Sequence, residues 1–206
     1  MKNAQKGFTI VELLISSLVF SVILLLVSYG LIYISKSYYK SVAQSQAQET
    51  ARSVIENVSQ AIQFNGGSVS GELTSGSDPE RAYCVGSRRY TFIPENQVVT
   101  GSASGRAFYA DKVTGTCADP QSLSVALPSV PDGKELLPEG MMLHEFSISK
   151  ESDTLYKVIV HLVILPPNES FPSDIFDSST GNCISGPGSE FCAASRLETV
   201  VEKRIL

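Results

Sequence analysis

Glu12 is the only charged residue in an otherwise apolar stretch that covers residues 8–34. An acidic side chain at the centre of a membrane-spanning helix is unfavourable by roughly 2.5–3.5 kcal/mol on insertion scales. A buried carboxylate is tolerated when an opposite charge neutralises it. Glu12 therefore predicts a cationic partner, unless it lies close enough to the membrane surface for its carboxylate to reach water.

Four cysteines lie beyond the apolar stretch and predict disulfides; they are Cys84, Cys117, Cys183 and Cys192. An even number confined to one part of a chain indicates an oxidising compartment. Three connectivities are open, and we favour the local one, Cys84 with Cys117 and Cys183 with Cys192. On an entropy model these two bonds contribute about 3.8 and about 2.7 kcal/mol. Free buried thiols and a zinc site are the alternatives.

Other candidates for metal chemistry are weaker. His144 and His161 are the only histidines, and both lie in stretches typical of ordinary strands. No cysteine pair has C-x-x-C spacing, so we expect neither a metal nor another cofactor. Asp174, Asp177 and Asn182 share a polar loop that could bind calcium. Their spacing fits no calcium-loop template, and turn residues are the favoured interpretation.

Nucleic-acid binding and catalysis are also disfavoured. Arg88, Arg89, Tyr90 and Phe92 form a basic–aromatic patch that could stack on single-stranded nucleic acid, but a strand face is the simpler interpretation. The 206-residue chain carries a formal net charge of −5, which offers no basic surplus for phosphate. There is no G-x-S-x-G, phosphate-binding glycine loop or H-E-x-x-H. We therefore expect no enzyme.

The apolar stretch would form a helix of about 27 residues, or about 40 Å, which exceeds the requirement of a bilayer core. A cleaved secretory signal has an apolar core of about 7–15 residues and a small-x-small cleavage site. Here Ser-Lys-Ser-Tyr follows at residues 35–38. A plain signal anchor remains open on hydropathy alone. We expect residues 8–34 to contact lipid. Lysines flank both ends of this stretch, so charge alone leaves its orientation open, and the cysteines place the C-terminal part outside the cytosol.

Residues 37–64 continue as a helix with one apolar face. Apolar or small residues recur at spacings of three and four, at Tyr39, Val42, Ala43, Ala47, Ala51, Val54, Ile55, Val58, Ala61 and Ile62. Glu49, Arg52 and Glu56 lie on the polar face. Asn-Gly-Gly at residues 65–67 predicts the end of the helix. The pattern predicts one helix over residues 8–64, about 85 Å long, with a weak point at Gly30 that costs about 1 kcal/mol relative to Ala.

The remainder of the chain predicts an antiparallel β-sheet. The β-prone segments are residues 81–85, 89–93, 106–110, 123–127, 143–149, 155–165 and 197–205. In the longest segment, Tyr156, Val158 and Val160 share one face, and Lys157 and His161 point the other way. This segment would pair with 143–149 across a turn at 150–154. The fold class is therefore α+β, with a sheet packed against the upper half of the helix.

Residues 6–12, Lys-Gly-Phe-Thr-Ile-Val-Glu, resemble the processing site of type IV pilins and type II secretion pseudopilins. The resemblance covers about the first 40 residues. It implies cleavage by a prepilin peptidase between Gly7 and Phe8, N-methylation of Phe8, and pairing of Glu12 with the Phe8 amine of a neighbouring subunit. The implied divisions are a leader over 1–7, a transmembrane and assembly helix over 8–35, a stem helix over 36–65 and a head over 66–206.

The resemblance implies a structural protein of a type IV pilus or pseudopilus. The large head, rich in Ser and Gly loops, favours a minor pilin or minor pseudopilin that acts in filament initiation or capping. Implied partners are other major and minor pilins and an inner-membrane assembly platform. The protein would be a single-pass inner-membrane protein with its head outside, then part of the filament. An anchored adhesin or DNA receptor, and an anchored hydrolase, are the alternatives.

Overall fold

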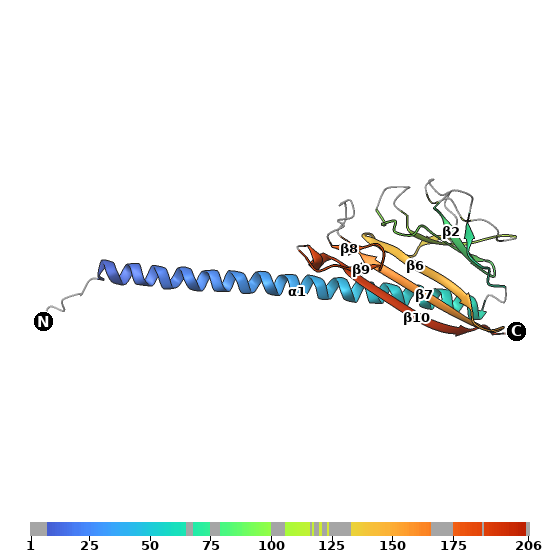
Figure 1. The fold of residues 1–206 in the computed structure, drawn as a ribbon, viewed down its shortest axis with the longest axis horizontal. Helices are drawn as coiled ribbons and strands as arrows, with labels where there is room; N and C mark the ends of the chain where they lie inside the picture. The colour runs from blue at the N-terminus through green and yellow to red at the C-terminus, as the bar shows by residue number, and fades with distance from the viewer. Residues whose placement is uncertain are drawn as a thin grey trace. The chain divides into compact units, whose positions relative to one another are not determined.

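The computed structural model describes residues 8–64, 68–74, 79–99, 106–115, 117, 120, 123, 133–165, 175–186 and 188–204. The chain divides into two compact units, Met1–Tyr39 and Lys40–Leu206. One helix, α1 (Ile10–Phe64), contributes to both units (Figure 1). It confirms the single long helix that the sequence predicts, and it continues through Gly30.

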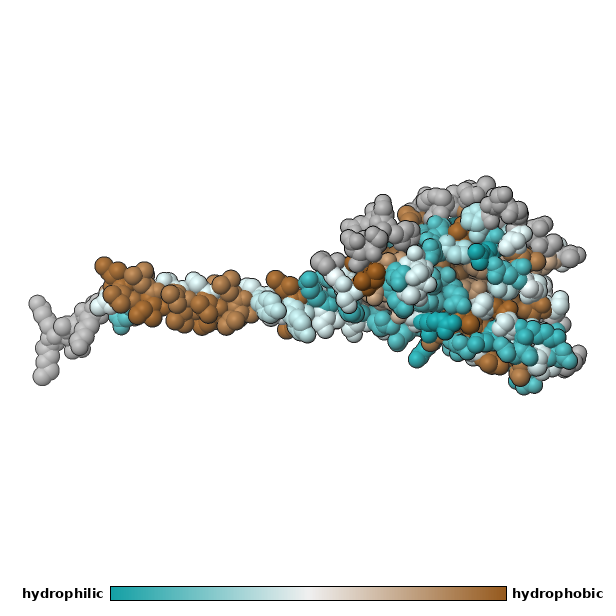
Figure 2. All heavy atoms as spheres, viewed as in Figure 1, coloured by the Kyte–Doolittle hydropathy of each residue, from teal (hydrophilic) through white to brown (hydrophobic). Residues whose placement is uncertain are grey.

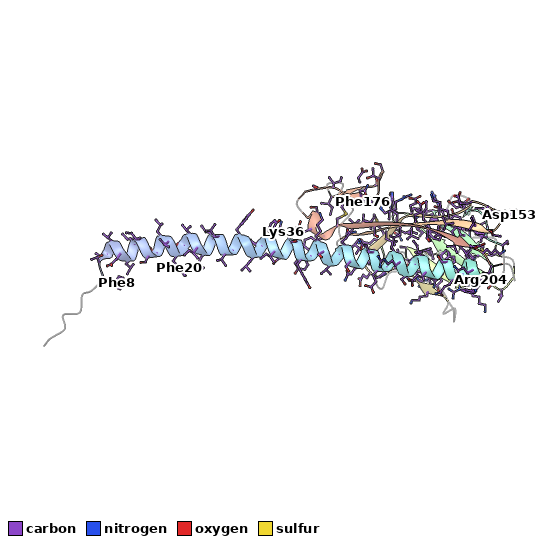
Figure 3. The ribbon with its side chains drawn as sticks, turned by 90° about the horizontal axis from the view of Figure 1, so that it is seen from below. Phe8, Phe20, Lys36, Asp153, Phe176 and Arg204 are labelled. Carbon is purple, nitrogen blue, oxygen red and sulfur yellow. A yellow bond between two sulfur atoms is a disulfide. The ribbon has the colours of Figure 1, made fainter. Side chains whose placement is uncertain are left out.

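The part of α1 in the first unit is apolar on every side. Residues 8–29 are all exposed, and large side chains such as Leu25 and Phe20 are 72% and 62% accessible. Figure 2 shows apolar side chains gathered along this part of the helix, and Figure 3 labels Phe8 and Phe20 on it. By its length and composition, α1 could cross a membrane.

The part of α1 in the second unit buries one stripe of small and β-branched side chains. The buried residues are Ala43, Ala47, Ala51, Val54, Val58, Ala61 and Ile62. This stripe is most of the predicted face, although Tyr39, which we expected on it, is exposed. Alanine at three successive turns has no long side chain to hold a neighbour away, so a sheet can approach the helix closely.

The described residues of the head form three antiparallel sheets where the sequence predicted one (Figure 1). The five-stranded sheet runs in chain order through β1 (Leu73–Thr74), β2 (Arg81–Val85), β3 (Arg88–Phe92), β4 (Phe108–Lys112) and β5 (Lys134–Glu135). The three-stranded sheet has the order β10 (Ala193–Glu202), β7 (Leu155–Ile164), β6 (Met141–Lys150). A small hairpin pairs β8 (Phe176–Asp177) with β9 (Asn182–Cys183), and a 3₁₀ turn, η1 (Ser189–Phe191), precedes β10.

The predicted α+β class, with a long helix packed against antiparallel sheet, is confirmed, and the described residues divide the sheet into separate ladders. Residues 93–98 reach β6 through one isolated bridge, Gln97 to Met142, and through the hydrogen bonds that the Glu95 and Val98 amides donate to the Leu143 and Met141 carbonyls. The strand β3 has already ended at Phe92. The two sheets therefore meet at an edge without sharing a continuous ladder.

Apart from residues 123–127, the predicted strands are present, but most of them begin or end at other residues than predicted. The predicted hairpin of 143–149 with 155–165 is confirmed as β6 and β7, and Tyr156, Val158 and Val160 do face the main core. Two segments are displaced: β4 begins two residues later than predicted, and β10 begins four residues earlier. Within the predicted strand 123–127 only Leu123 is described, as a bend, and residues 124–127 lie outside the described residues.

The main core lies between the second part of α1 and the two larger sheets. Its centre is the ring of Phe146, which lies 4.7 Å from the Phe108 ring centroid and 5.4 Å from that of Phe92. Tyr83 and Tyr90 complete this aromatic cluster. Val58 of α1 is fully buried in the same core. Burial of these rings dominates the apolar stabilisation of the head.

Candidate processing and assembly site

The predicted processing site lies at the start of α1. Gly7 is outside the described residues, whereas Phe8 is described and its side chain is 81% exposed. Phe8 and Thr9 precede the first helical residue, Ile10. Phe8 therefore lies just outside the helix.

Thr9 and Glu12 form a reciprocal cap at this helix end. The Thr9 hydroxyl accepts the Glu12 amide at 3.3 Å, and the Glu12 carboxylate accepts both the Thr9 amide and the Thr9 hydroxyl at 3.2 Å. This arrangement is a capping box, in which a Thr at the N-cap and a Glu three residues later satisfy each other's backbone amides. The carboxylate also lies at the positive end of the helix dipole.

The capping box assigns a role to Thr9 that the sequence reasoning missed. The signal was present, since Thr9-Ile-Val-Glu12 has the T-x-x-E pattern ahead of an apolar run. The cap gives the Glu12 carboxylate two donors from its own chain. A neighbouring amine would therefore meet a carboxylate that is already oriented.

Other polar side chains in this part of α1 bond to the helix itself. The Ser16 hydroxyl donates to the Glu12 carbonyl at 2.8 Å, Ser17 donates to the Leu14 carbonyl at 2.9 Å, and Ser21 donates to the Ser17 carbonyl at 2.8 Å. Serine commonly makes such local bonds in helices. Because these hydroxyls are satisfied locally, they are compatible with an apolar surrounding.

The four cysteines form two disulfides in the head. Cys84 is joined to Cys117 and Cys183 to Cys192, with Cα–Cα distances of 6.1 and 5.8 Å. This is the same local pairing that the sequence favoured. The second bond ties β9 to the residue that precedes β10.

The residues considered for calcium serve as turn residues where they are described. The Asp177 carboxylate accepts the Ser179 hydroxyl at 2.6 Å, the Ser179 amide at 2.9 Å and the Thr180 hydroxyl at 2.9 Å. These bonds keep the pKa of Asp177 below its usual value. Asn182 pairs with Asp177 in the hairpin, and Asp174 lies outside the described residues. Among the described residues, no group of three or more His, Cys, Asp or Glu side chains is placed to hold a metal ion.

The basic–aromatic patch does not form an exposed surface for nucleic acid. Tyr90 and Phe92 are 0% and 2% exposed and belong to the main core. Arg89 makes a two-pronged ion pair with Asp111, with N–O distances of 3.0 and 2.6 Å. Arg88 donates to the side chain of Asn57 on α1 at 3.2 Å. The strand-face interpretation of this segment is therefore the correct one.

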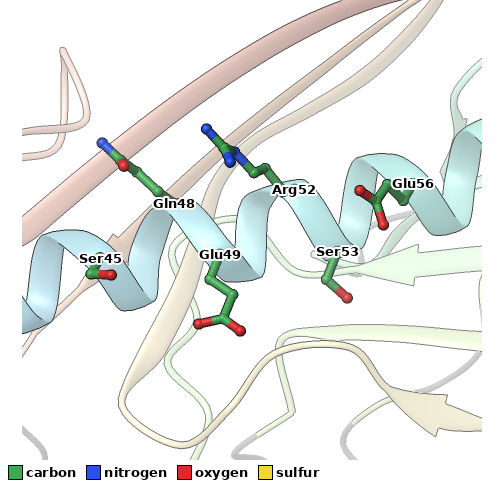
Figure 4. A pocket seen from close by; sticks show the side chains of 6 residues that line it. All are labelled: Ser45, Gln48, Glu49, Arg52, Ser53 and Glu56. Atoms are coloured by element: carbon green, nitrogen blue, oxygen red, sulfur yellow. The ribbon is translucent and has the colours of Figure 1, made fainter.

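Two open grooves border the second part of α1. One, of about 400 Å³, follows the polar face of the helix at Ser45, Gln48, Glu49, Arg52, Ser53 and Glu56 (Figure 4). The other, of about 560 Å³, adds Leu136, Pro138, Glu139, Met141 and Ile164 to neighbouring helix residues. Figure 4 shows the polar side chains spread along successive turns, without convergence on one point. Neither groove brings together a nucleophile and a base.

The comparisons with known proteins match the N-terminal region. Residues 2–28 match the model described as the prokaryotic N-terminal methylation motif. The match supports a type IV prepilin-like protein. No curated protein and no solved structure matches the chain. In this prepilin-like chain the long apolar helix, the two disulfides and the α+β head fit a membrane-anchored pilin-like protein, and the motif indicates a structural role.

Proposed function

We propose that this chain is a minor subunit of a type IV pilus or pseudopilus and that it acts in filament assembly. In this proposal a prepilin peptidase cuts between Gly7 and Phe8 and the new amine of Phe8 is methylated. The observation that carries the proposal is the N-terminal methylation motif at residues 2–28. A basic leader and an apolar helix with one acidic residue surround the cleavage point.

The exposed apolar surface of the first unit supports assembly into a filament. Its side chains are large and accessible, with Leu25 at 72% and Leu26 at 68%. Monomeric soluble proteins rarely expose continuous apolar surface of this kind. Lipid would cover it before assembly, and the helices of other subunits would cover it afterwards.

Glu12 would fix the register between subunits. After cleavage the Phe8 amine is cationic near neutral pH. Two opposite charges in a medium of low dielectric constant are tolerated as a pair, and removal of one leaves the other at high cost. Because Thr9 already orients the Glu12 carboxylate, the amine of a neighbour would complete the site.

The head supports the choice of a minor subunit through its size. It occupies the chain beyond α1 and contains three sheets and two disulfides. Its expected partners are other pilins and the inner-membrane assembly platform. Mass spectrometry of purified filaments would measure its copy number, and we expect it well below that of the main subunit. An equal or greater copy number would contradict the minor role and leave the pilin assignment intact.

Processing is tested by co-expression of the chain with a prepilin peptidase, followed by intact-mass measurement and mapping of the N-terminal peptide. We expect a mature chain that begins with N-methylated Phe8. Gly7→Leu should abolish cleavage. Gly30→Ala is the matched control, because no atom lies within 4 Å of an added Cβ there, and it should be processed normally. A full-length chain in the presence of active peptidase would overturn the proposal.

The proposed pairing of Glu12 with the amine of a neighbouring subunit is tested separately from the role of Glu12 in the helix cap. Glu12→Gln keeps an acceptor for the Thr9 amide and removes the charge. We expect processing to remain normal and incorporation into filaments to fall at least about tenfold, since loss of one member of a buried pair costs about 3–5 kcal/mol. Ser16→Ala is the control that removes a nearby polar group without removing the charge. Unchanged incorporation of Glu12→Gln would remove the charge-pairing step.

A further inference from the structure

The two histidines of the chain lie side by side on the outer face of the three-stranded sheet. The main core covers the other face, where Val158 and Val160 point toward α1. His161 is only 4% exposed, and its ring centroid lies 5.0 Å from that of His144, with the ring planes at 83°. These residues are 17 positions apart in sequence, and the pairing of β6 with β7 brings them together.

The strand β6 is irregular at His144. The register of β6 against β7 shifts between Leu143 and Glu145, so His144 is the extra residue of a β-bulge. A bulge changes the direction of side chains and is common beside functional sites. Leu143 packs in the main core, so the alternation of the strand already directs His144 to the outer face; the extra residue directs Glu145 to that face as well, opposite His161, and returns Phe146 to the core.

The β8–β9 hairpin closes over this pair of rings. Gly181, in the turn, has a φ of +70°, and a Cβ at this position would overlap the Cδ2 atom of His144 and the Cε1 atom of His161. The His161 ring is hydrogen-bonded to the Gly181 backbone, and the Phe176 ring lies 6.2 Å from that of His144. The hairpin therefore rests directly on the two imidazoles.

Each ring is surrounded by a different set of charges. His144 Nδ1 is buried and makes no hydrogen bond within the described residues, and it lies 3.4 Å from the Glu95 carboxylate. His161 is faced by His144 and Glu145 from β6 and by Arg196 from β10. Arg196 in turn pairs with Glu145 at 3.4 Å, so that carboxylate is already partly neutralised. From the hairpin, the backbone of Gly181 and the ring of Phe176 face the pair.

The backbone beside Glu95 also indicates a constrained site. Glu95 is the only non-glycine residue with positive φ among the described residues, at 59°. Such a conformation costs free energy and persists where the surroundings enforce it. The Glu95 amide donates to the Leu143 carbonyl at 2.8 Å, next to the bulge. Glu95, with its positive φ, and the bulge in β6 therefore both lie at His144.

We propose that His144 and His161 form a pH-sensitive latch that holds the β8–β9 hairpin against the sheet while the rings are neutral and releases it when both are protonated. Protonation of both rings places a cation on His161 beside Arg196, with the two ring centroids 5.0 Å apart. Two like charges at this distance under a closed hairpin repel strongly, and opening to water relieves the repulsion.

The direction of the pH effect follows from His161. Burial lowers the pKa of His161 from its ordinary value of 6.5, and the neighbouring His144 lowers it further. A group with a depressed pKa in the closed state takes up its proton when the hairpin opens. The closed state is therefore fully favoured above pH 6.5 and loses stability as the pH falls below that value.

A disulfide and a set of apolar contacts limit how far the β8–β9 hairpin can open. The Cys183–Cys192 disulfide still ties the end of the hairpin to the sheet, and Ile175 and Phe176 pack with Met142, Val163 and Leu165 in a second, smaller core. Opening would expose this small core and leave the main core intact. The expected product is an exposed apolar patch on a head that remains folded.

The test uses the full chain in detergent micelles and amide hydrogen exchange followed by mass spectrometry. Exchange is measured at pH 7.5, 6 and 5 and corrected for the pH dependence of the chemical exchange rate. Peptides from residues 175–186 should lose protection at low pH, by about tenfold for each unit by which the pKa differs between the closed and open states. Peptides from β3 and β4 are the internal reference and should not change.

Variants separate the latch from a general acid effect. His161→Gln and His144→Gln keep a hydrogen-bonding side chain that cannot titrate in this range, and each should abolish most of the pH dependence. Glu139→Gln, an exposed carboxylate on the loop before β6, is the control and should behave as the wild type.

Two results would overturn the proposal. One is equal protection of residues 175–186 at pH 7.5 and 5 in the wild type. The other is the same pH dependence in His161→Gln as in the wild type. If the variants do not fold, the wild type still decides the matter. With only two histidines in the chain, their two Cε1–H resonances can be titrated directly, and protonation of both rings without loss of hairpin protection would contradict the latch.

Discussion

The two parts of α1 share one secondary structure and have opposite surfaces. In the first unit the helix presents large apolar residues on every side, and residues 8–29 are all exposed. In the second unit it buries a narrow stripe of Ala and Val and presents Glu49, Arg52 and Glu56 to solvent. The same hydrogen-bonded helical backbone therefore forms in both surroundings, and the side chains decide what each part contacts.

Different residues carry the stability of the head and the exposed apolar surface of the first unit. Ala47 and Ala51 are fully buried because a sheet packs directly on them. Leu25 and Leu26 are exposed and would be covered by lipid or by other subunits. Substitutions in one part should therefore leave the property of the other part unchanged.

The largest expected effect comes from a charge on the buried stripe. Val58→Asp places a carboxylate at a position with 0% exposure in the main core, and we expect the free energy of unfolding of the head to fall by about 4 kcal/mol or more. The control is Val27→Asp in the first unit, where the side chain is 53% exposed. It should leave head unfolding unchanged.

Guanidinium unfolding in micelles, followed by the near-ultraviolet circular dichroism of the eight tyrosines, would measure both variants. An equal loss of head stability in the two variants would contradict the separation of the two parts.

The next largest losses of stability are expected from removal of the disulfides. Replacement of Cys84 and Cys117 by alanine opens the longer loop and should cost about 3.8 kcal/mol, whereas the same change at Cys183 and Cys192 should cost about 2.7 kcal/mol. Their sequence separations are 33 and 9 residues. Both double variants would be compared with the wild type by the same unfolding measurement. A larger cost for the shorter loop would show that loop length does not govern these bonds.

A smaller effect is expected at the start of α1. Thr9→Val removes the hydroxyl that accepts the Glu12 amide and should destabilise the first helical turn by about 1 kcal/mol. Amide exchange at residues 10–13 in micelles would report it, with Ser16→Ala as the control. Unchanged exchange in Thr9→Val would mean that the capping box does not stabilise this end. Head unfolding should not respond to either variant.

The smallest effect has the opposite sign. Gly30→Ala should stabilise the helix by about 0.5–1 kcal/mol, because alanine loses less backbone entropy and nothing lies within 4 Å of its Cβ. Slower amide exchange around residue 30 would show this gain. Faster exchange would mean that the glycine is required for a contact made in the filament or the membrane.

Patterns that repeat every few residues along one element could be predicted from the sequence. The apolar run, the three- and four-residue spacing of residues 43–62 and the alternation in β7 each reflect a local geometry that repeats along one element. The leader motif is likewise contiguous, and it predicts the role of Gly7, Phe8 and Glu12. Those three roles stay predictions until processing and assembly are measured.

Contacts between elements that are distant in the sequence could not be predicted from the sequence. Arg89 and Tyr90 look like an exposed basic–aromatic patch until Asp111 of β4 and Asn57 of α1 are brought beside them. Strand ends shifted by up to four residues because the partner strand, and not local propensity, determines where a ladder begins.

The sequence by itself determined a long helix, its change from apolar to amphipathic character and a β-rich head, and it favoured the local pairing of cysteines. Only the tertiary structure decided that the head divides into three sheets and that His144 meets His161 under Gly181. The physical reason is that the neighbours of a side chain on a sheet depend on the partner strand and on the segment that packs over that face. These neighbours are in place only when β7 and the β8–β9 hairpin occupy the space beside β6.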